Sequence, residues 1–474
     1  MKIIRRKKMA CNSASCESGC YKDDERPVAA NGNASNPRRG GVNVPGVCLK
    51  CKINQTIAVT HPAVAGSAGE GGRFCADCFR SNLLGKFRFA VTSNAMISPS
   101  DNILVAFSGG SASRVALQFV HEMQQKAQKN FDASRERERV LPVFGVGVAY
   151  IDETTMCAEA SSEFGEAANE VELIVSNLTP PTKQFLAIPT ESIYSPELAV
   201  GRDSLKRLGD VVRDLTGKED LNKHLRMLSL QKAAFDNGYN KIVLGTCTSR
   251  IACHVLEATV KGQGFSLAAD IQYVDARWKV PVVLPLRDCL SEELNMLCSL
   301  DSLKTVEASQ QPRAGINGLI SSFVKLLQEE NPSRESTIVR TAGKLTPFSF
   351  NKTPEVDDPN ERLATKRRQK KYNLKPDKSQ PPESFCLVCS SPLKKSNTSG
   401  LNGLALEETS AVIYAAACSS CQYQILPKDT SSMEHFLSLL PQSITTLAKD
   451  SSDSHMFLRE QIQDLLLSDS DDGT

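Results

Sequence analysis

The stretch ILVAFSGGSASRVAL, residues 103–117, joins a buried strand to a helix through a glycine turn. Its first five residues are apolar and partly β-branched, which is typical of a strand that is buried on both faces. From Val115 to Met123 apolar side chains recur at helical spacing. Free backbone N–H groups in such a turn form an anion site, to which serine hydroxyls can add donors. The turn therefore predicts a phosphate-binding loop made of Ser108, Gly109, Gly110, Ser111 and Ser113.

Four further apolar runs predict strands of the same sheet, at residues 142–152, 171–176, 241–245 and 280–286. Helices are expected between several of them, including one from about Asp220 that Gly238 is placed to end. Alternation of strands and helices implies a parallel sheet that is covered by helices on both faces. The predicted fold class is therefore α/β, and the ligands of such a sheet bind at the carboxyl ends of its strands.

The composition of the 474-residue chain limits its class, since 41% of its residues are hydrophobic and its formal net charge is +2. No run approaches the roughly 18 consecutive apolar residues that a membrane helix needs. The opening MKIIRRKKMA lacks the apolar segment of a secretory signal. We therefore expect a cytoplasmic chain with no membrane contact. The balanced charge does not by itself favour nucleic-acid binding, so any basic surface is local or shared with a partner.

Composition also divides the chain into six predicted parts. Residues 1–44 are rich in Ser, Asn, Gly, Pro and charge and are expected to form a flexible leader, and the three cysteines within it match no metal signature. The remaining parts are a zinc module (45–95), the α/β domain (96–345), a basic linker (346–384), a second zinc module (385–430), and a short helix with an acidic tail (431–474).

Eight of the sixteen cysteines form four Cys-x-x-Cys pairs. Each pair can place two thiolates on one side of a tight turn, and two facing pairs give the closed four-sulfur set that suits zinc. In a reducing compartment this spacing indicates metal before disulfide, with redox pairs or unrelated thiols as the alternative. We expect two structural zinc sites, one at Cys48, Cys51, Cys75 and Cys78 and one at Cys386, Cys389, Cys418 and Cys421.

Two basic stretches could contact the phosphate backbone of a nucleic acid. In FRSNLLGKFRFA, residues 79–90, basic residues alternate with phenylalanines, and this mix suits phosphate contacts and an amphipathic packing helix about equally well. The predicted linker has a run of positive charge, for which a solvated spacer is the simpler explanation. The candidate residues for contact with a nucleic-acid backbone are Arg80, Lys86, Arg88, Lys366, Arg367 and Arg368.

The glycine turn resembles Ser-Gly-Gly-x-Asp-Ser, the pyrophosphate loop of ATP-dependent adenylating enzymes of the tRNA-thiolation and GMP-synthetase type. The resemblance implies a domain of the adenine-nucleotide-hydrolase kind, in which the loop holds the β- and γ-phosphates of ATP. The Asp of that pattern is Ala112 in this chain. Loss of this carboxylate impairs catalysis more than anion binding, so ATP stays open as a ligand of this chain.

A second departure from that family follows the predicted strand 241–245. Active tRNA thiolases of the family have a Gly-His-Asn-x-Asp-Asp loop there, whereas this chain reads GTCTSRIACHVL, with Ser249 and Arg250 in place of the acidic pair. Cys247 and Cys253 lie in this stretch and are the candidate sulfur-carrying thiols. Nothing in the sequence indicates a lowered thiol pKa, so ordinary structural thiols are the favoured interpretation.

The motifs CLKC, FCADCF, KFR, LVAFSGGSASR, GVAYIDE, LGTCTSR and VPVVLPLRD, with the late Cys-x-x-Cys pairs, closely resemble the second, loop-degenerate subunits of cytoplasmic tRNA 2-thiolation complexes. The resemblance covers most of the chain from about residue 44. It implies a heterodimer with a catalytic thiouridylase subunit. That pair makes 5-methoxycarbonylmethyl-2-thiouridine at the wobble position of lysine, glutamine and glutamate tRNAs, with sulfur from a thiocarboxylated ubiquitin-related modifier.

Two other functions stay open at the level of sequence. The chain could be an active ATP-dependent tRNA sulfurtransferase that uses Cys247 or Cys253. It could also be a zinc-folded adaptor that never contacts RNA. The resemblance favours a non-catalytic subunit that supports tRNA binding and the catalytic partner.

Overall fold

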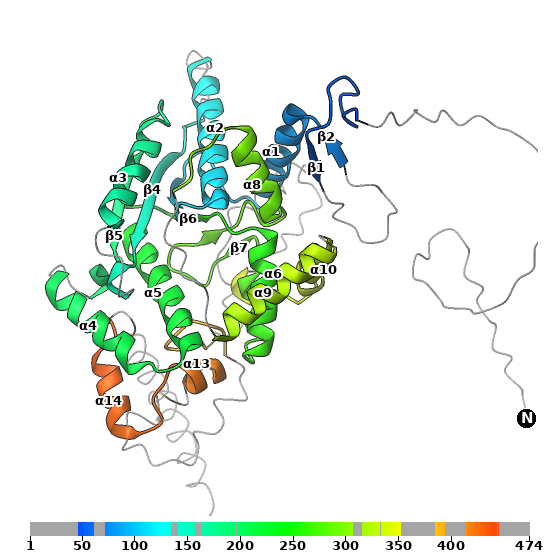
Figure 1. Ribbon diagram of the computed structural model, residues 1–474. Coiled ribbons are helices and arrows are strands. Elements are labelled where there is room, and N and C mark those ends of the chain that lie inside the picture. The colour runs from blue at the N-terminus through cyan, green and yellow to red at the C-terminus, as the bar shows by residue number, and fades with distance from the viewer. Residues whose placement is uncertain are drawn as a thin grey trace, which may run out of the picture. The chain divides into compact units, whose positions relative to one another are not determined.

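The computed structural model describes residues 46–60, 72–133, 141–156, 163–194, 198–306, 315–331, 333–351, 384–393, 414, 416–442 and 444. These residues belong to one compact unit, Gly46–Thr474. At its centre is a six-stranded sheet with the strand order β5-β4-β3-β6-β8-β7 (Figure 1). The strands are β3 (Asn102–Ala106), β4 (Gly145–Asp152), β5 (Gln184–Pro189), β6 (Lys241–Leu244), β7 (Val274–Asp275) and β8 (Val282–Val283).

Four of the five strand pairings in this sheet are parallel, and the edge strand β7 runs antiparallel to β8. The predicted α/β class is therefore confirmed, with an antiparallel edge that the sequence did not indicate. At the carboxyl end of β3, Ala106 pairs with Ala149 of β4 and with Leu244 of β6. The glycine turn after β3 thus lies where parallel sheets bind their ligands.

One predicted strand was wrong. Residues 171–176 belong to α3 (Glu163–Ser176), and the strand that pairs with β4 is β5 instead. Val171, Ile174 and Val175 are buried at the spacing of one helix face, and a short apolar run does not by itself distinguish that spacing from a buried strand. Because β5 lies at the sheet edge with only Ile188 buried, its sequence has little of the signal of an inner strand.

Helices cover both faces of the sheet. One hydrophobic cluster joins Ile103 and Val105 to α1 (Ala76–Ser93), α2 (Ser111–Ala133), α3 and α8 (Ser291–Leu300), and Figure 1 shows α2 and α8 side by side. The second joins Leu104, on the opposite face of β3, to α5 (Leu215–Asp236), α6 (Thr248–Val260), α7 (Leu267–Asp270) and α10 (Ser333–Ala342). Alternate residues of one strand thus serve two cores.

The ends of α5 follow from its caps. The Asp214 side chain accepts a hydrogen bond from the backbone N–H of Gly217 at 2.7 Å, so the helix begins at Leu215, earlier than predicted. Gly238 follows its C-terminus with a φ of 71°, a left-handed conformation that suits glycine. The predicted stop at Gly238 is confirmed.

A third hydrophobic cluster ties the C-terminal part of the chain to the α/β fold. It contains Leu205 and Leu208 of α4 (Leu198–Val211), Leu221 of α5, and residues of α13 (Ser419–Gln424) and α14 (Thr430–Ser438). The Tyr194 hydroxyl also donates a hydrogen bond to the Leu439 carbonyl at 2.9 Å. The second cysteine group therefore packs on α4 and α5.

The remaining elements are short or peripheral. They are β1 (Ala58–Thr60), which pairs antiparallel with β2 (Gly72–Phe74), α9 (Gly315–Glu330), and the 3-10 turns at Thr154–Met156, Thr190–Ile193 and Ser349–Asn351. The ring of Phe350, in the last of these turns, lies 5.8 Å from the ring of Phe385. No helix in the described part of the chain has the length and apolar content to cross a membrane.

Candidate functional site

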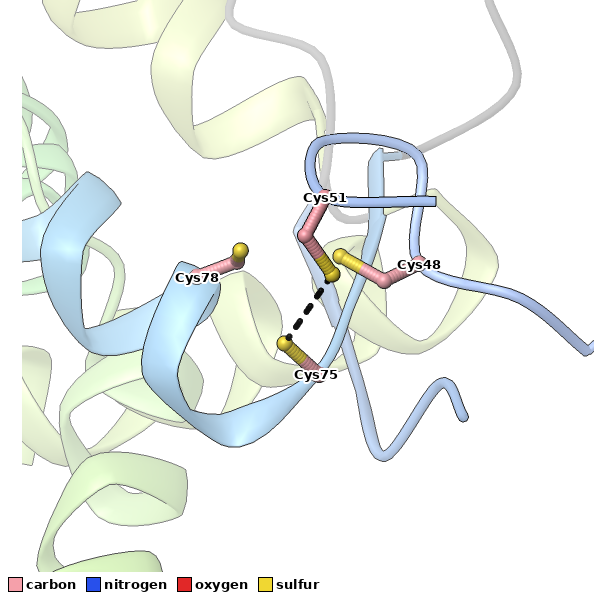
Figure 2. A group of neighbouring side chains, drawn as sticks. All are labelled: Cys48, Cys51, Cys75 and Cys78. Atoms are coloured by element: carbon pink, nitrogen blue, oxygen red, sulfur yellow. Dashed lines mark hydrogen bonds between the residues drawn. The ribbon is translucent and has the colours of Figure 1, made fainter. Parts of the chain in front are cut away.

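The first cysteine group brings four thiols together. The Sγ atoms of Cys48, Cys51, Cys75 and Cys78 all lie within 4.8 Å of one another, and those of Cys51 and Cys75 are 3.8 Å apart (Figure 2). Four thiolates around one tetrahedral ion with Zn–S bonds near 2.3 Å stand about 3.8 Å apart. The spacing therefore fits a single metal ion that is closed by four sulfur ligands.

Two different backbone devices present these thiols. Cys48 and Cys51 lie on a tight turn that is closed by a hydrogen bond from the Lys52 N–H to the Cys48 carbonyl at 2.9 Å, with Lys52 at a φ of 57°. Cys75 is the N-cap of α1, and Cys78 follows in the first helical turn. The helix N-terminus carries a partial positive charge that favours thiolates.

Nearby backbone N–H groups favour the thiolate form of one cysteine in this group, which is the form that binds metal. Burial opposes ionisation of Cys48, but backbone N–H groups of Cys51, Cys75 and Lys50 together outweigh it and lower the pKa of this thiol to about 6. By contrast, burial and the neighbouring thiols raise the pKa of Cys78 to about 12. A bound cation would remove that opposition, because metal ligation requires the deprotonated thiolate.

The second cysteine group repeats this plan. The Sγ atoms of Cys386, Cys389, Cys418 and Cys421 lie within 4.8 Å of one another, with Cys389 and Cys418 3.6 Å apart. Ser390 has a φ of 56° and donates its N–H to the Cys386 carbonyl at 2.8 Å, while Cys418 is the N-cap of α13. Each group thus combines a tight turn with a helix N-terminus.

Sequence reasoning missed two side chains that contact these sulfurs. Asn54 Nδ2 donates toward Cys75 Sγ at 3.8 Å, and Gln263 Nε2 donates toward Cys418 Sγ at 3.7 Å. Asn54 lies three residues after Cys51, close enough in sequence for its amide to be considered as a hydrogen-bond donor to the cysteine group. Gln263 comes from the segment after α6, so only the fold brings it to the second group.

The glycine turn is held by its own serines. The Ser113 hydroxyl accepts from the Ser108 N–H at 3.2 Å and donates to the Gly110 carbonyl at 2.8 Å. Gly109 has a φ of 85°, and a Cβ there would lie 2.6 Å from the Val306 carbonyl oxygen. The predicted turn therefore forms, and glycine is required at position 109 by both conformation and space.

Segments distant in sequence close over this turn. The Ser111 hydroxyl hydrogen-bonds Asn295 of α8, and the Val306 N–H donates to the Gly109 carbonyl at 3.0 Å. Among the described residues, the N–H groups of Gly109, Gly110 and Ser111 have no hydrogen-bond partner. The turn thus has N–H donors that are free to bind an anion, whereas its hydroxyls and the carbonyls of Gly109 and Gly110 are bonded within the protein.

The loop after β6 buries its first thiol. Cys247 is 1% exposed, lies in a hydrophobic core and is the N-cap of α6, and burial raises the pKa of this thiol. Cys253, six residues farther along in α6, is half-buried. The hydroxyl of Ser249, which takes an acidic position of the family loop, donates to Glu335 at 2.6 Å. Cys247 is therefore inaccessible, and its burial disfavours the thiolate.

Two of the predicted tRNA-contact residues are paired with carboxylates. Arg80 contacts Glu122 and Asp301, and Lys86 lies 2.9 Å from Glu293. Arg88 is exposed beside Phe89, which is 71% exposed. The structure does not describe the positions Lys366, Arg367 and Arg368.

The chain is similar to proteins of one named family. A family model described as cytoplasmic tRNA 2-thiolation protein 2 matches residues 315–435. The protein of that name from Arabidopsis thaliana is 57% identical over 98% of this chain and 100% of its own length. Its namesake from Oryza sativa subsp. indica is 51% identical over 87% of this chain and 88% of its own length.

More distant similarity extends to animals and to a solved structure. The Homo sapiens protein of the same name is 26% identical over 63% of this chain and 67% of its own length. The U34-tRNA thiolase NcsA from Methanococcus maripaludis, solved with its 4Fe-4S cluster, covers 63% of this chain and 87% of its own, with a TM-score of 0.45 and 15% identity. The near-complete match to the Arabidopsis protein decides the relationship: this chain belongs to the family of cytoplasmic tRNA 2-thiolation protein 2.

Proposed function

We propose that this chain is the non-catalytic subunit of a cytoplasmic tRNA thiolase heterodimer. In this function it would support 2-thiolation of the wobble uridine in lysine, glutamine and glutamate tRNAs. A catalytic thiouridylase would adenylate the uridine, and a thiocarboxylated ubiquitin-related modifier would donate sulfur. The likeness to relatives that are named cytoplasmic tRNA 2-thiolation protein 2 supports the pathway.

The observation that carries the non-catalytic role is Ala112 in an otherwise formed glycine turn. The turn keeps free N–H donors, yet it has no carboxylate at the position where the family's adenylating loop has Asp. A carboxylate is the usual protein ligand for Mg²⁺ beside phosphate, so this turn lacks a group that adenylation would use. Phosphate binding without adenylation is the chemistry that remains.

The buried thiol argues against the alternative, an active sulfurtransferase using Cys247 or Cys253. A sulfur carrier must be accessible and must ionise easily. Cys247 meets neither requirement, since it is 1% exposed and its pKa is raised by burial. Cys253 is half-buried, so it is the thiol for which the alternative needs a direct test.

Zinc is the metal that we propose for both cysteine groups. Sulfur atoms 3.6–3.8 Å apart fit one tetrahedral ion, whereas a four-iron cluster would place its own iron and sulfide atoms between the ligands and spread them farther. With all four positions filled by sulfur, zinc would stabilise the fold and leave no site for a reacting water.

The basic residues available for tRNA are fewer than the sequence indicated. We infer that Arg88 and the run Lys366, Arg367 and Arg368 are the better candidates, because Arg80 and Lys86 are neutralised by carboxylates. A basic side chain that already forms an ion pair with a carboxylate contributes little to the binding free energy of a phosphate. The tRNA surface would therefore be shared with the catalytic subunit.

An assay of tRNA-dependent pyrophosphate release from ATP tests this proposal. The chain is purified alone and with its catalytic partner, and 2-thiouridine is measured in the same reactions. We expect release only from the pair, and Cys247→Ser and Cys253→Ser variants that keep full 2-thiouridine. Pyrophosphate release by this chain alone, or loss of 2-thiouridine in Cys253→Ser with the heterodimer intact, would establish a catalytic subunit instead.

A further inference from the structure

The outer face of α9 presents a stripe of large apolar side chains. Leu319, Phe323 and Leu326 are 73%, 49% and 59% exposed. Their spacing of four and then three residues places all three on one side of the helix. The inner face of α9 packs through Asn317 and Val324, which are buried. The exposed stripe is therefore a second apolar face of one helix, and contiguous apolar surface of this kind marks a contact site.

The C-terminal sequence contains a stretch with the same apolar spacing. HMFLREQIQDLLL, residues 455–467, lies outside the described residues. Its Leu458, Ile462 and Leu465 are also separated by four and then three residues. Two helices with matching stripes of this spacing can interdigitate side by side.

The chain is long enough to bring this stretch to α9. Ile444 is the last described residue and lies in the hydrophobic cluster with α13 and α14. The start of α9 is near that cluster, because Gly315 abuts Thr216 of α5 while the adjacent Gly217 abuts Gln424 of α13. Thirteen residues separate Ile444 from Leu458 and span up to about 45 Å, against about 24 Å for the length of α9.

Charge selects one direction of packing. The stretch 455–467 is followed by three acidic residues, Asp469, Asp471 and Asp472, whereas α9 ends in Glu329 and Glu330. An antiparallel arrangement places the acidic tail at the positive N-terminal end of α9 and keeps it away from Glu329 and Glu330. A parallel arrangement would oppose like charges.

We propose that residues 455–467 pack antiparallel along the stripe formed by Leu319, Phe323 and Leu326. Leu458 then lies opposite Leu326, Ile462 opposite Phe323, and Leu465 opposite Leu319. The acidic end of the chain extends past Gly315. This contact is independent of the proposed function, since it rests on α9 and on the C-terminal sequence alone.

Photocrosslinking in the full chain tests the contact. Benzoylphenylalanine replaces Phe323, or as a matched control Phe235, which is 54% exposed on α5. Isotopically heavy and light chains are mixed, and the crosslinked peptides are identified by mass spectrometry with and without the catalytic partner. We expect position 323 to crosslink near Ile462 of the same chain in both conditions, and position 235 not to reach residues 455–467.

Two additional arms test direction and specificity. Probes at 319 and 326 are expected to crosslink near Leu465 and Leu458 respectively, and the reverse order would overturn the antiparallel arrangement. Ile462→Asp is expected to reduce the crosslink from position 323 at least tenfold with unchanged metal content and melting temperature. Crosslinks to a second copy of the chain, to the catalytic partner only, or to no part of residues 455–467 would overturn the proposal.

Discussion

Lys52 and Ser390 occupy equivalent positions in the two cysteine groups. Each follows the second cysteine of a Cys-x-x-Cys turn, has a φ near +57° (57° and 56°), and donates its N–H to the carbonyl of the first cysteine. Neither residue is glycine, although this backbone conformation favours glycine. The chain thus holds two non-glycine residues in a strained conformation at the turns that present its thiols.

Glycine at these positions should stabilise the protein. Lys52→Gly and Ser390→Gly are expected to leave the metal content unchanged and to increase the free energy of unfolding by up to about 1 kcal/mol, because the left-handed penalty is removed. Lys52→Val and Ser390→Val should decrease it by more than about 1 kcal/mol, since a β-branched side chain fits this conformation poorly. Urea unfolding of the four variants measures both effects, and equal stability of the Gly and Val variants would contradict the strain.

Loss of one ligand should cost one metal ion and much of the stability of the whole unit. Cys421→Ser is expected to bind one zinc per chain instead of two and to lose several kcal/mol of unfolding free energy, because its group shares a core with α4 and α5. Cys253→Ser, a half-buried thiol outside both groups, is the control and should retain two. Metal analysis by mass spectrometry gives the count, and iron in place of zinc would contradict the assignment.

Three glycines near the turn should respond differently to alanine. A Cβ at Gly245 would lie 2.7 Å from the Ser113 backbone, and one at Gly109 would meet Val306 at a left-handed φ, whereas one at Gly110 meets no atom within 4 Å. We expect Gly245→Ala and Gly109→Ala to lose about 1–3 kcal/mol and Gly110→Ala to stay near the native value. Thermal unfolding distinguishes them, and a destabilised Gly110→Ala would show that the turn is packed more tightly than described.

A buried histidine should make the protein sensitive to acid. Lys183 Nζ lies 2.8 Å from His121 Nδ1, and burial and this lysine's charge lower the pKa of His121 to about 4. Between about pH 6.5 and 4 this histidine is therefore protonated in the unfolded chain but largely neutral in the folded chain. The free energy of unfolding consequently decreases as pH falls through this range. His121→Gln removes this titrating group. Over the same pH range, its free energy of unfolding should decrease by on the order of 2 kcal/mol less than that of the native chain.

Urea unfolding at pH 6.5 and 4.5 measures this difference. Acid also releases metal from thiolates, so the comparison is made between variants at the same pH. The exposed His435 of α14 provides the control, and His435→Gln should follow the native chain. An equal acid loss in His121→Gln would mean that this histidine does not contribute to the pH dependence.

Local sequence signals predicted the elements that depend on few neighbours. The strand and turn at residues 103–113 form as expected, because an apolar run followed by glycines and serines has few other stable conformations. The cysteine spacing likewise brought the thiols into two groups, since four donors at these intervals specify their own geometry. By contrast, the apolar run 171–176 is compatible with either a buried strand or one face of a helix, and only the pairing of β5 with β4 excludes the strand.

Contacts across long sequence distances could not be predicted. The partners of Arg80 and Lys86 are Asp301 and Glu293, which are 221 and 207 residues away. A single sequence contains no signal for which carboxylate will lie beside a given cation. The same reason explains why Asn295 and Val306 were not connected to the glycine turn.

The contact between Tyr194 and Leu439 spans 245 residues of sequence. During synthesis α4 and α5 leave the ribosome long before the residues that complete their hydrophobic cluster, so those residues cannot cover Leu205, Leu208 and Leu221 until they are made. Apolar surface that stays uncovered in this way favours aggregation of incomplete chains. Truncation of the chain before the second cysteine group would therefore leave this core incomplete, because Cys386, Cys418 and Cys421 belong to it.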